Sequence, residues 1–249
     1  MENTERIDVL LVTKGFSRSR TAASVYIKEG RVTVNGRKVA KPSEKFEEDC
    51  EISVVYPETD FVSRGGKKLT GAIEGFGLDV KGKTCLDIGA STGGFTHCLL
   101  INGASKVYAV DSGTDQLAAS LRDDARVVCR ENTNARYIRK SDFEDKIELV
   151  VMDVSFISQT LLYPAVADIL EPDGVFVSLV KPQFELSKQR LSKNGIVKDR
   201  DGSIYEEIIE KIRRLSAENG LSLKKVIKSP ITGGDGNTEY LALFIKEKK

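Results

Sequence analysis

TCLDIGASTGGF, residues 84–95, is the stretch that decides the fold predicted from this sequence. It begins with a largely apolar run of strand length that stops at Gly89, and two further glycines follow at positions 93 and 94. Glycine allows backbone conformations and close approaches that a side chain would block. A helix predicted over residues 96–101 would leave its first amide groups free to face a ligand. Strand, glycine turn and helix together form the nucleotide-binding unit of doubly wound α/β folds.

The spacing of these glycines excludes two common phosphate-binding motifs. The dinucleotide fingerprint G-x-G-x-x-G would need a glycine where Ser91 stands, and no Gly-Lys-Ser/Thr closes this turn as a phosphate loop requires. The pattern is instead Asp-x-Gly-x-x-x-Gly-Gly, with Asp87 at the end of the strand. A carboxylate at this point would repel a pyrophosphate, but it suits S-adenosylmethionine, which carries amino and sulfonium groups. A merely structural turn is the alternative interpretation of the glycines alone.

Length and composition are those of an ordinary globular protein. The 249 residues suffice for one large α/β domain and a smaller one. Four cysteines lie far apart without a Cys-x-x-Cys, and His97 is the single histidine, so we expect neither a metal site nor a disulfide framework. A reducing cytoplasm is therefore the expected location. The first twenty residues are too charged for a secretory signal, and no apolar run approaches the length of a membrane span.

The net charge of +1 conceals two regions of opposite charge. Between residues 14 and 45 nine basic residues stand against two acidic ones, a local charge of +7, which leaves −6 for the rest of the chain. Such asymmetry predicts a module that faces nucleic acid, joined to a body of a different kind.

Residues 6–56 have the pattern of two short helices followed by a basic hairpin. Apolar spacing predicts helices over residues 6–14 and from Ser17 or Ser19 to residue 28, and Asn35-Gly36 between alternating residues predicts a hairpin closed by a strand over residues 51–56. The pattern R-x-D-x-L-L…S-R-S-x-A…I-x-x-G-x-V-x-V-N-G resembles the S4 RNA-binding domain. A solvated basic face on a small structural domain is the alternative.

The basic side chains of this region would bind phosphates and so supply affinity rather than choice of sequence. The candidate RNA-binding residues are Arg6, Lys14, Arg18, Arg20, Arg31, Arg37, Lys38 and, beyond the basic region, Arg64.

The remainder of the chain alternates between predicted strands and helices. The strands are expected at residues 84–88, 106–110, 127–129, 149–153, 174–180, 223–228 and 240–245. The helices are expected at residues 68–76, after a flexible cationic turn at 63–68, and at residues 96–101, 115–122, 157–170 and 202–219. Because no helix separates the last two strands, we expect an antiparallel final strand on a parallel, Rossmann-like sheet of seven strands.

Charged residues end four of these strands. Ligands of open α/β sheets bind beyond the carboxyl ends of the strands. Asp111, 24 residues beyond Asp87, is expected to accept hydrogen bonds from ribose hydroxyls. Asp153 and Lys181 fall at the same edge. Each alone could be a solvated strand end, but their shared edge predicts a site.

Over essentially its full length the chain resembles the TlyA family, which joins an S4 domain to an FtsJ-like methyltransferase domain that uses S-adenosylmethionine. The resemblance rests on SRGGKKL, CLDIGASTGGFT, VDSGTDQL, RENTNAR, MDVSFIS, LVKPQFE and GGDGNTEYL. It implies 2′-O-methylation of a ribose, that of cytidine, in ribosomal RNA. The expected organisation is an S4-like domain at residues 1–57, a linker at 58–64 and the methyltransferase domain at 65–249. No oligomeric state is predicted.

The resemblance also assigns the site residues. The FtsJ tetrad maps onto Lys68, Asp153, Lys181 and Glu239. Lys68 is preferred over the adjacent Lys67 because it immediately precedes the leucine of the helix. The expected cofactor-binding residues are Asp87, Gly89, Ala90, Ser91, Gly93, Gly94, Phe95, Asp111, Glu131, Asn132 and Asp153.

The expected chemistry is removal of a proton from the ribose 2′-hydroxyl as it attacks the methyl group. A lysine can accept that proton only in its neutral form, which burial or a second ammonium nearby favours. Lys181, with Lys68 close by, is the expected base, and Asp153 and Glu239 are expected to orient the lysines and the ribose.

Three other functions are weighed against this one. A pore-forming haemolysin, the activity in the family's older name, would need a spanning segment or a strongly apolar amphipathic helix. A nonenzymatic RNA-binding factor has no need of an intact tetrad. A methyltransferase for a base nitrogen commonly carries Asn/Asp-Pro-Pro-Tyr/Phe after the fourth strand, where Asp153-Val-Ser-Phe stands here.

Overall fold

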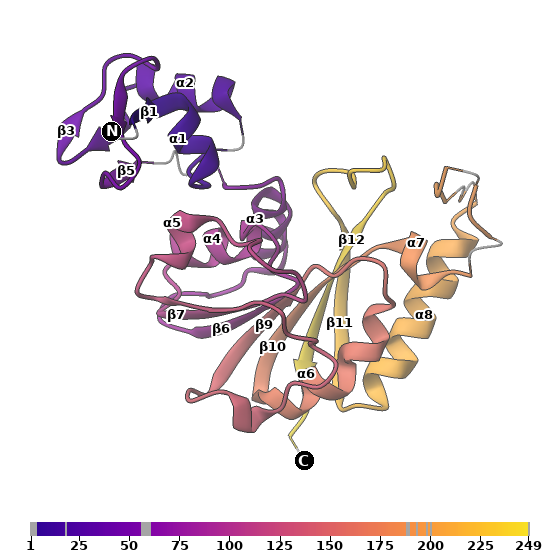
Figure 1. Ribbon diagram of the computed structural model, residues 1–249. Coiled ribbons are helices and arrows are strands. Elements are labelled where there is room, and N and C mark those ends of the chain that lie inside the picture. The colour runs from indigo at the N-terminus through magenta and orange to yellow at the C-terminus, as the bar shows by residue number, and fades with distance from the viewer. Residues whose placement is uncertain are drawn as a thin grey trace.

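The computed structural model describes residues 4–17, 19–55, 61–187, 190–192, 194–197, 199 and 201–248. The chain forms a small N-terminal domain and a larger α/β domain, with the small domain above one edge of the large sheet (Figure 1). Residues 56–60, which include the end of the predicted closing strand and part of the predicted linker, lie outside the described residues. Among the described residues, no helix is both long enough and apolar enough to cross a bilayer.

The small domain contains the two helices and the hairpin that the sequence predicts. Its elements are β1 (Thr4–Arg6), α1 (Ile7–Thr13), α2 (Arg20–Lys28), β2 (Val32–Val34), β3 (Arg37–Lys38), β4 (Lys45–Glu47) and β5 (Ile52–Val54). Ser19 caps α2 by accepting a hydrogen bond from the amide of Ala22. Asn35 and Gly36 both have positive φ, as a tight hairpin turn requires. The pairing of β1 with β4 was not predicted.

The large domain is built on one sheet with the strand order β11-β12-β10-β9-β6-β7-β8. Its strands are β6 (Thr84–Ile88), β7 (Lys106–Val110), β8 (Val127–Arg130), β9 (Ile147–Met152), β10 (Leu170–Val180), β11 (Leu221–Lys228) and β12 (Tyr240–Lys246). β12 runs antiparallel to both of its neighbours, β10 and β11, whereas the pairs from β10 to β8 are parallel. The predicted seven-stranded, Rossmann-like sheet with a reversed last strand is confirmed.

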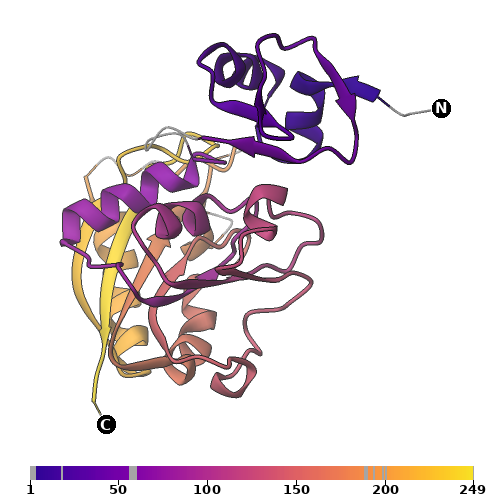
Figure 2. The ribbon, with the colours of Figure 1, turned by 90° about the vertical axis from the view of Figure 1, so that its left-hand side faces the viewer.

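Helices cover both faces of this sheet (Figures 1 and 2). They are α3 (Gly65–Phe76), α4 (Gly94–Ile101), α5 (Ala119–Arg122), α6 (Tyr163–Ile169), α7 (Pro182–Glu185) and α8 (Ser203–Ala217), with short 3-10 turns η1 (Lys140–Asp142) and η2 (Gln159–Leu162). Alternate residues of a strand point to opposite faces, so Leu86 packs in the cluster that contains residues of α6 and α8, and Cys85 packs in the cluster that contains residues of α3 and α4. The strands are thus buried on both sides, as expected for a parallel sheet.

The predicted flexible turn at residues 63–68 was largely wrong, because α3 already begins at Gly65. A Cβ on Gly66 would lie 2.0 Å from the ring of Phe61, so this glycine serves close packing rather than flexibility.

Two other predicted helices are shorter than expected. Only residues 119–122 of the helix predicted from residue 115 are helical. Asp115 has a positive φ, and the carboxylate of Glu131 accepts hydrogen bonds from the amides of residues 115–117. The helix predicted over residues 157–170 is divided into η2 and α6.

We predict that Gly66→Ala destabilises the large domain by about 1–3 kcal/mol, because the new methyl group would overpack against Phe61. Gly65→Ala in the same helix is the matched control, since its Cβ would lie 3.5 Å from the nearest atom. Thermal unfolding measures both variants. Equal stability of the two would contradict the packing role of Gly66.

Candidate active site

Two adjoining cavities open where the carboxyl ends of the central strands meet. One, of about 390 Å³, is lined by the start of α3, the glycine turn, Lys181 and the loop that contains Thr232 and Gly234. The other, of about 400 Å³, is lined by the glycine turn, Asp111 and residues 133–136. They share Gly89, Ser91, Asp153 and Ser155, so they form one continuous trough.

The glycine turn needs its glycines for two reasons. Gly89 and Gly93 have φ of 81° and 95°, which side chains rarely adopt. A Cβ on Gly89 would lie 2.6 Å from the carbonyl oxygen of Asp153, and one on Gly93 would lie 2.2 Å from Leu121. The turn therefore brings bare backbone and the start of α4 to the trough, which is the arrangement expected for binding a nucleotide-like ligand.

Asp87 lies behind the glycine turn rather than in the trough. Its side chain is fully buried, and one oxygen accepts a hydrogen bond from the hydroxyl of Thr96 at 2.7 Å. The other oxygen has no hydrogen-bond partner among the described residues. Burial raises the pKa of Asp87 to about 7, and the nearby charge of Asp153 adds to that rise. Its role as a cofactor-binding residue stays a prediction.

Asp111 follows β7 directly and lines the second cavity, as predicted for an acid that faces a ribose. Its two oxygens accept hydrogen bonds from the amides of Ser91 at 2.8 Å and Gly113 at 2.7 Å. These bonds hold the carboxylate in place beside the glycine turn.

Glu131 and Asn132 line neither cavity of the trough. The Glu131 carboxylate accepts three backbone hydrogen bonds from residues 115–117 at 2.7–2.8 Å, and these hold its pKa below the usual value. Glu131 therefore orders the loop beside the trough, and its predicted contact with the cofactor stays a prediction. The neighbouring residues that do line the trough, which sequence reasoning did not single out, are Thr133, Asn134, Ala135 and Arg136.

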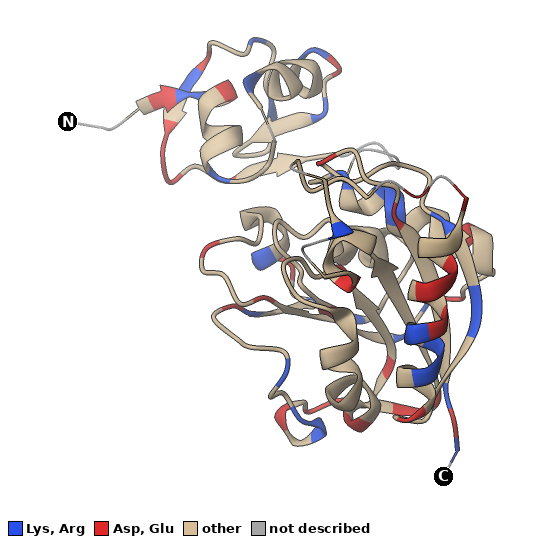
Figure 3. Cartoon of the chain, turned by 90° about the vertical axis from the view of Figure 1, so that its right-hand side faces the viewer, with Lys and Arg blue, Asp and Glu red and all other residues tan. Residues whose placement is uncertain are grey.

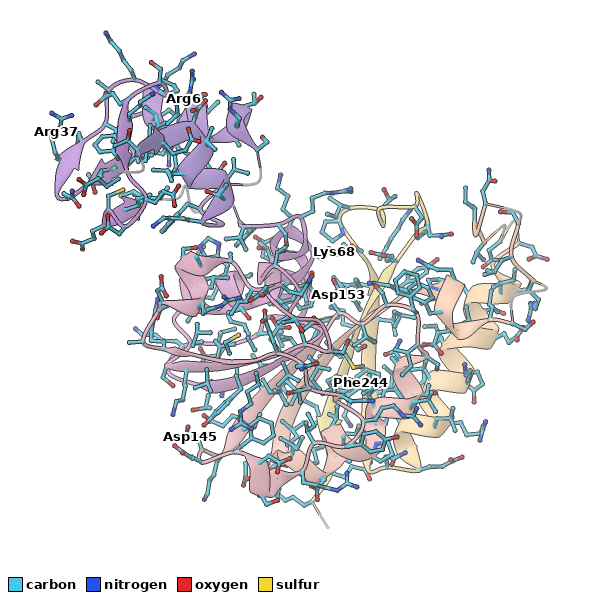
Figure 4. All side chains as sticks on the ribbon, viewed as in Figure 1. Arg6, Arg37, Lys68, Asp145, Asp153 and Phe244 are labelled. Atoms are coloured by element: carbon cyan, nitrogen blue, oxygen red, sulfur yellow. The ribbon has the colours of Figure 1, made fainter. Side chains whose placement is uncertain are left out.

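The four residues of the predicted tetrad form two ion pairs. Lys68 Nζ lies 2.6 Å from Glu239, and both side chains are nearly buried. Lys181 Nζ lies 2.6 Å from Asp153 and donates a hydrogen bond to the hydroxyl of Ser155 at 2.8 Å. Lys68, Asp153 and Lys181 line the same cavity, and Figure 4 shows Lys68 and Asp153 close to each other at this edge of the sheet.

Lys67 is exposed, whereas Lys68 is buried. The geometry therefore favours Lys68 over its neighbour as the lysine of the site.

Phe156 is a feature of the site that sequence reasoning missed. It is 92% exposed, its φ is 64°, and it lines the trough with its ring 5.3 Å from that of Phe184. A bulky residue in this backbone region is strained, and such strain concentrates at functional sites. The available signal in the sequence was an aromatic residue three positions after Asp153, the phenylalanine of MDVSFIS.

The candidate RNA-binding residues lie mostly on the small domain, where lysines and arginines recur along the chain (Figure 3). Arg20, Arg37 and Lys38 are exposed, and Arg6, Lys14 and Arg31 are partly exposed. Arg18 lies outside the described residues. Arg64, at the start of α3, donates a hydrogen bond to the carbonyl of Thr232 at 3.0 Å and lines the trough.

Lys14 and Arg64 also line one further cavity, of about 700 Å³, together with Thr92 of the glycine turn. Lys14 of the small domain thus lies in a cavity that also reaches the glycine turn.

Two family models match separate parts of the chain. Residues 61–246 match the family described as FtsJ-like methyltransferase, and residues 5–52 match the S4 domain. Hemolysin A of Brachyspira hyodysenteriae is 44% identical over 96% of this chain and 99% of its own length. The 16S/23S rRNA (cytidine-2′-O)-methyltransferase TlyA of Mycobacterium tuberculosis is 41% identical over 96% of this chain and 89% of its own length.

Solved structures also resemble this chain. A protein from Streptococcus thermophilus that carries the name hemolysin is 42% identical, with a TM-score of 0.74, and the match covers 100% of this chain and 90% of that one. An S-adenosylmethionine-dependent methyltransferase from Listeria monocytogenes shares the fold at 17% identity, with a TM-score of 0.55, over 75% of this chain and 100% of that one.

We predict that the free energy of unfolding of the unsubstituted protein falls, relative to that of Asp87→Asn, as pH rises from about 4 to about 7. The buried carboxyl keeps its proton up to a pKa of about 7, whereas the unfolded chain loses it near 3.8, so the unsubstituted protein loses stability across this window. The expected slope is at most about 1.4 kcal/mol per pH unit. Urea unfolding at several pH values measures it, with Asp123→Asn on an exposed turn as control. If the free energy of unfolding changes with pH in the same way for Asp87→Asn and the unsubstituted protein, the raised pKa of Asp87 is contradicted.

Proposed function

Because the chain belongs to the FtsJ-like methyltransferase family and carries an S4 domain, we propose that it transfers a methyl group from S-adenosylmethionine to the 2′-hydroxyl of a cytidine in ribosomal RNA. The observation that carries the proposal is the pair of lysine–carboxylate contacts, Lys68–Glu239 and Lys181–Asp153, at one cavity beside the glycine turn. The nucleotide class, cytidine, comes from the name of the M. tuberculosis relative.

The residues of the trough fit S-adenosylmethionine. Gly89 and Gly93 leave backbone free of side chains where the ligand must approach closely, and Asp111 supplies a carboxylate for the ribose hydroxyls. The bound cofactor supplies an electrophilic methyl group. The protein's part is to hold the target ribose in line with that methyl group, and much of the rate acceleration should come from this positioning.

Lys181 is the residue that we assign as the base. Its Nζ contacts both Asp153 and Ser155, which hold it at the wall of the cavity. In its neutral form Nζ would accept the proton that the 2′-hydroxyl loses as its oxygen attacks the methyl group. Lys68, held by Glu239, would orient the ribose from the side of α3.

The S4 domain is proposed to dock the RNA, with ribosomal subunits as the partners and the cytoplasm as the place of action. Its exposed basic residues would bind phosphates, and Lys14 and Arg64 would extend this surface toward the trough.

Transfer of a labelled methyl group to isolated ribosomal subunits, followed by mapping of 2′-O-methyl positions, tests the proposed function. We expect label on the 2′-oxygen of a cytidine. Label on a base nitrogen, or none on either subunit, would overturn the proposal.

We predict that Lys181→Arg abolishes methyl transfer and leaves cofactor binding near normal. Arginine keeps the positive charge but cannot deprotonate in the working range, because its pKa is above about 12. Activity of the unsubstituted protein should rise with pH, since the neutral amine is required. Single-turnover rates of methyl transfer by Lys181→Arg and Lys181→Ala show whether Lys181 acts as the base. Substantial activity of the arginine variant would make Lys181 a charge stabiliser and not the base.

We predict that Asp111→Ala weakens S-adenosylmethionine binding by about 1–3 kcal/mol, because it removes the acceptor proposed for the ribose hydroxyls. Calorimetric titration of the folded variant measures the loss. Asp115→Ala is the control, since this exposed acid follows the same strand but does not line the trough. If Asp111→Ala binds S-adenosylmethionine as tightly as the unsubstituted protein, Asp111 does not hold the ribose.

A further inference from the structure

One buried carboxylate in the small domain holds two arginines. Asp8 is only 3% exposed. Its oxygens accept hydrogen bonds from Nε and NH2 of Arg6 at 2.9 and 3.1 Å, and from Nε and NH2 of Arg20 at 3.1 and 2.9 Å. The arginine side chains are 40% and 58% exposed, so the acid lies inside and the two cations lie at the surface.

All three residues are fixed to regular structure. Arg6 ends β1, Asp8 lies in the first turn of α1, and Arg20 is the first residue of α2. Ile7 and Leu11 of the same helix are fully buried and anchor α1 in the core of the domain. The hydrogen bonds with Arg6 lower the pKa of Asp8, and those with Arg20 lower it further, so the acid stays charged.

We propose that Asp8 is a positioning residue that makes Arg6 and Arg20 a rigid clamp for the phosphate backbone of RNA. Each guanidinium carries five N–H donors and uses two of them on Asp8, which leaves three that can face solvent. A planar guanidinium with fixed orientation matches the oxygens of a phosphate in a bidentate way. The inference rests on the proposed function in that it takes RNA as the ligand of the S4 domain. Figure 4 shows Arg6 on the small domain, away from Lys68 and Asp153.

The other arginine pairs of this domain differ from the clamp. Arg31 pairs with Glu29, whose side chain is 47% exposed, and Arg37 pairs with Glu44, whose side chain is 24% exposed. Each of these acids holds a single arginine near the surface, whereas Asp8 is buried and holds two.

If Asp8 positions the arginines, its removal should weaken RNA binding, whereas if only net charge matters, its removal should strengthen RNA binding. Loss of an acid from an RNA-binding domain makes the domain more positive, and if only charge mattered the RNA would bind more tightly. If Asp8 positions the arginines, its loss frees two long side chains, which must then be ordered again when RNA binds.

The test measures binding of a labelled RNA hairpin by fluorescence anisotropy over a range of salt concentrations. We expect Asp8→Asn to bind about tenfold more weakly than the unsubstituted protein, because two side chains lose their order. The slope of log affinity against log salt should shrink by about one for each phosphate contact that is lost. Glu47→Gln, which removes the same charge from an exposed position on β4, should bind as well or slightly better. Equal or tighter binding by Asp8→Asn would overturn the clamp.

A mutant cycle separates positioning from a purely structural role of Asp8. Arg20→Lys keeps the charge but cannot make the paired bonds, so it should cost about tenfold in affinity on its own and little in the Asp8→Asn background. An equal cost in both backgrounds would overturn the proposal. Thermal unfolding and calorimetric titration with S-adenosylmethionine establish that the variants are folded.

Failure of the clamp and failure of the proposed function can be told apart, because RNA binding is measured without methyl transfer. Unsubstituted protein that binds the hairpin through the clamp but methylates no ribosomal subunit would overturn the proposed function and leave the clamp in place. Unsubstituted protein that does not bind the hairpin would overturn the clamp.

Discussion

The backbone of Gly89 passes so close to the carbonyl oxygen of Asp153 that no side chain fits between them. A Cβ on Gly89 would lie 2.6 Å from that oxygen, and the amide of Asp153 donates a hydrogen bond to the carbonyl of Ile88 at 3.0 Å. This approach joins the ends of β6 and β9, two neighbouring strands at the centre of the sheet. Because the strands end together, the glycine turn and Asp153 face one trough, and Lys181 at the end of the adjacent β10 can reach Asp153.

Charge balance is the second constraint on the site. Two lysines and two carboxylates with little exposure would be costly to bury singly, and each lysine lies 2.6 Å from one carboxylate. Buried ion pairs are weak evidence for stability, since their desolvation offsets much of the attraction. Their place at and beside one cavity agrees with the proposed reaction, which needs charged groups held in fixed positions. The same logic applies to Asp8, where a buried acid fixes two exposed cations.

Much of the fold could be predicted because its signals are local. Strand length, glycine spacing and the absence of a helix before β12 are all contained in short stretches of sequence. What could not be predicted depends on contacts between distant residues. Gly66 follows another glycine and suggested a flexible turn, but it lies in α3, and the ring of Phe61 leaves no room for a side chain there. The sequence also gave no sign that the carboxylate of Glu131 accepts hydrogen bonds from amides 14–16 residues earlier in the chain. β1 and β4 are three residues each, too short for a periodic pattern, and pair only in the folded domain.

The reversed direction of β12 has a consequence for how the site is completed. A parallel strand brings its last residue to the trough, and only an antiparallel strand can bring its first residue there. Glu239 immediately precedes β12, whose first residue, Tyr240, pairs with Val180 beside Lys181. The partner of Lys68 therefore reaches the site only when β12 inserts between β10 and β11. The glycine turn and the carboxylate that pairs with Lys68 therefore depend on different strands, the first on β6 and the second on β12.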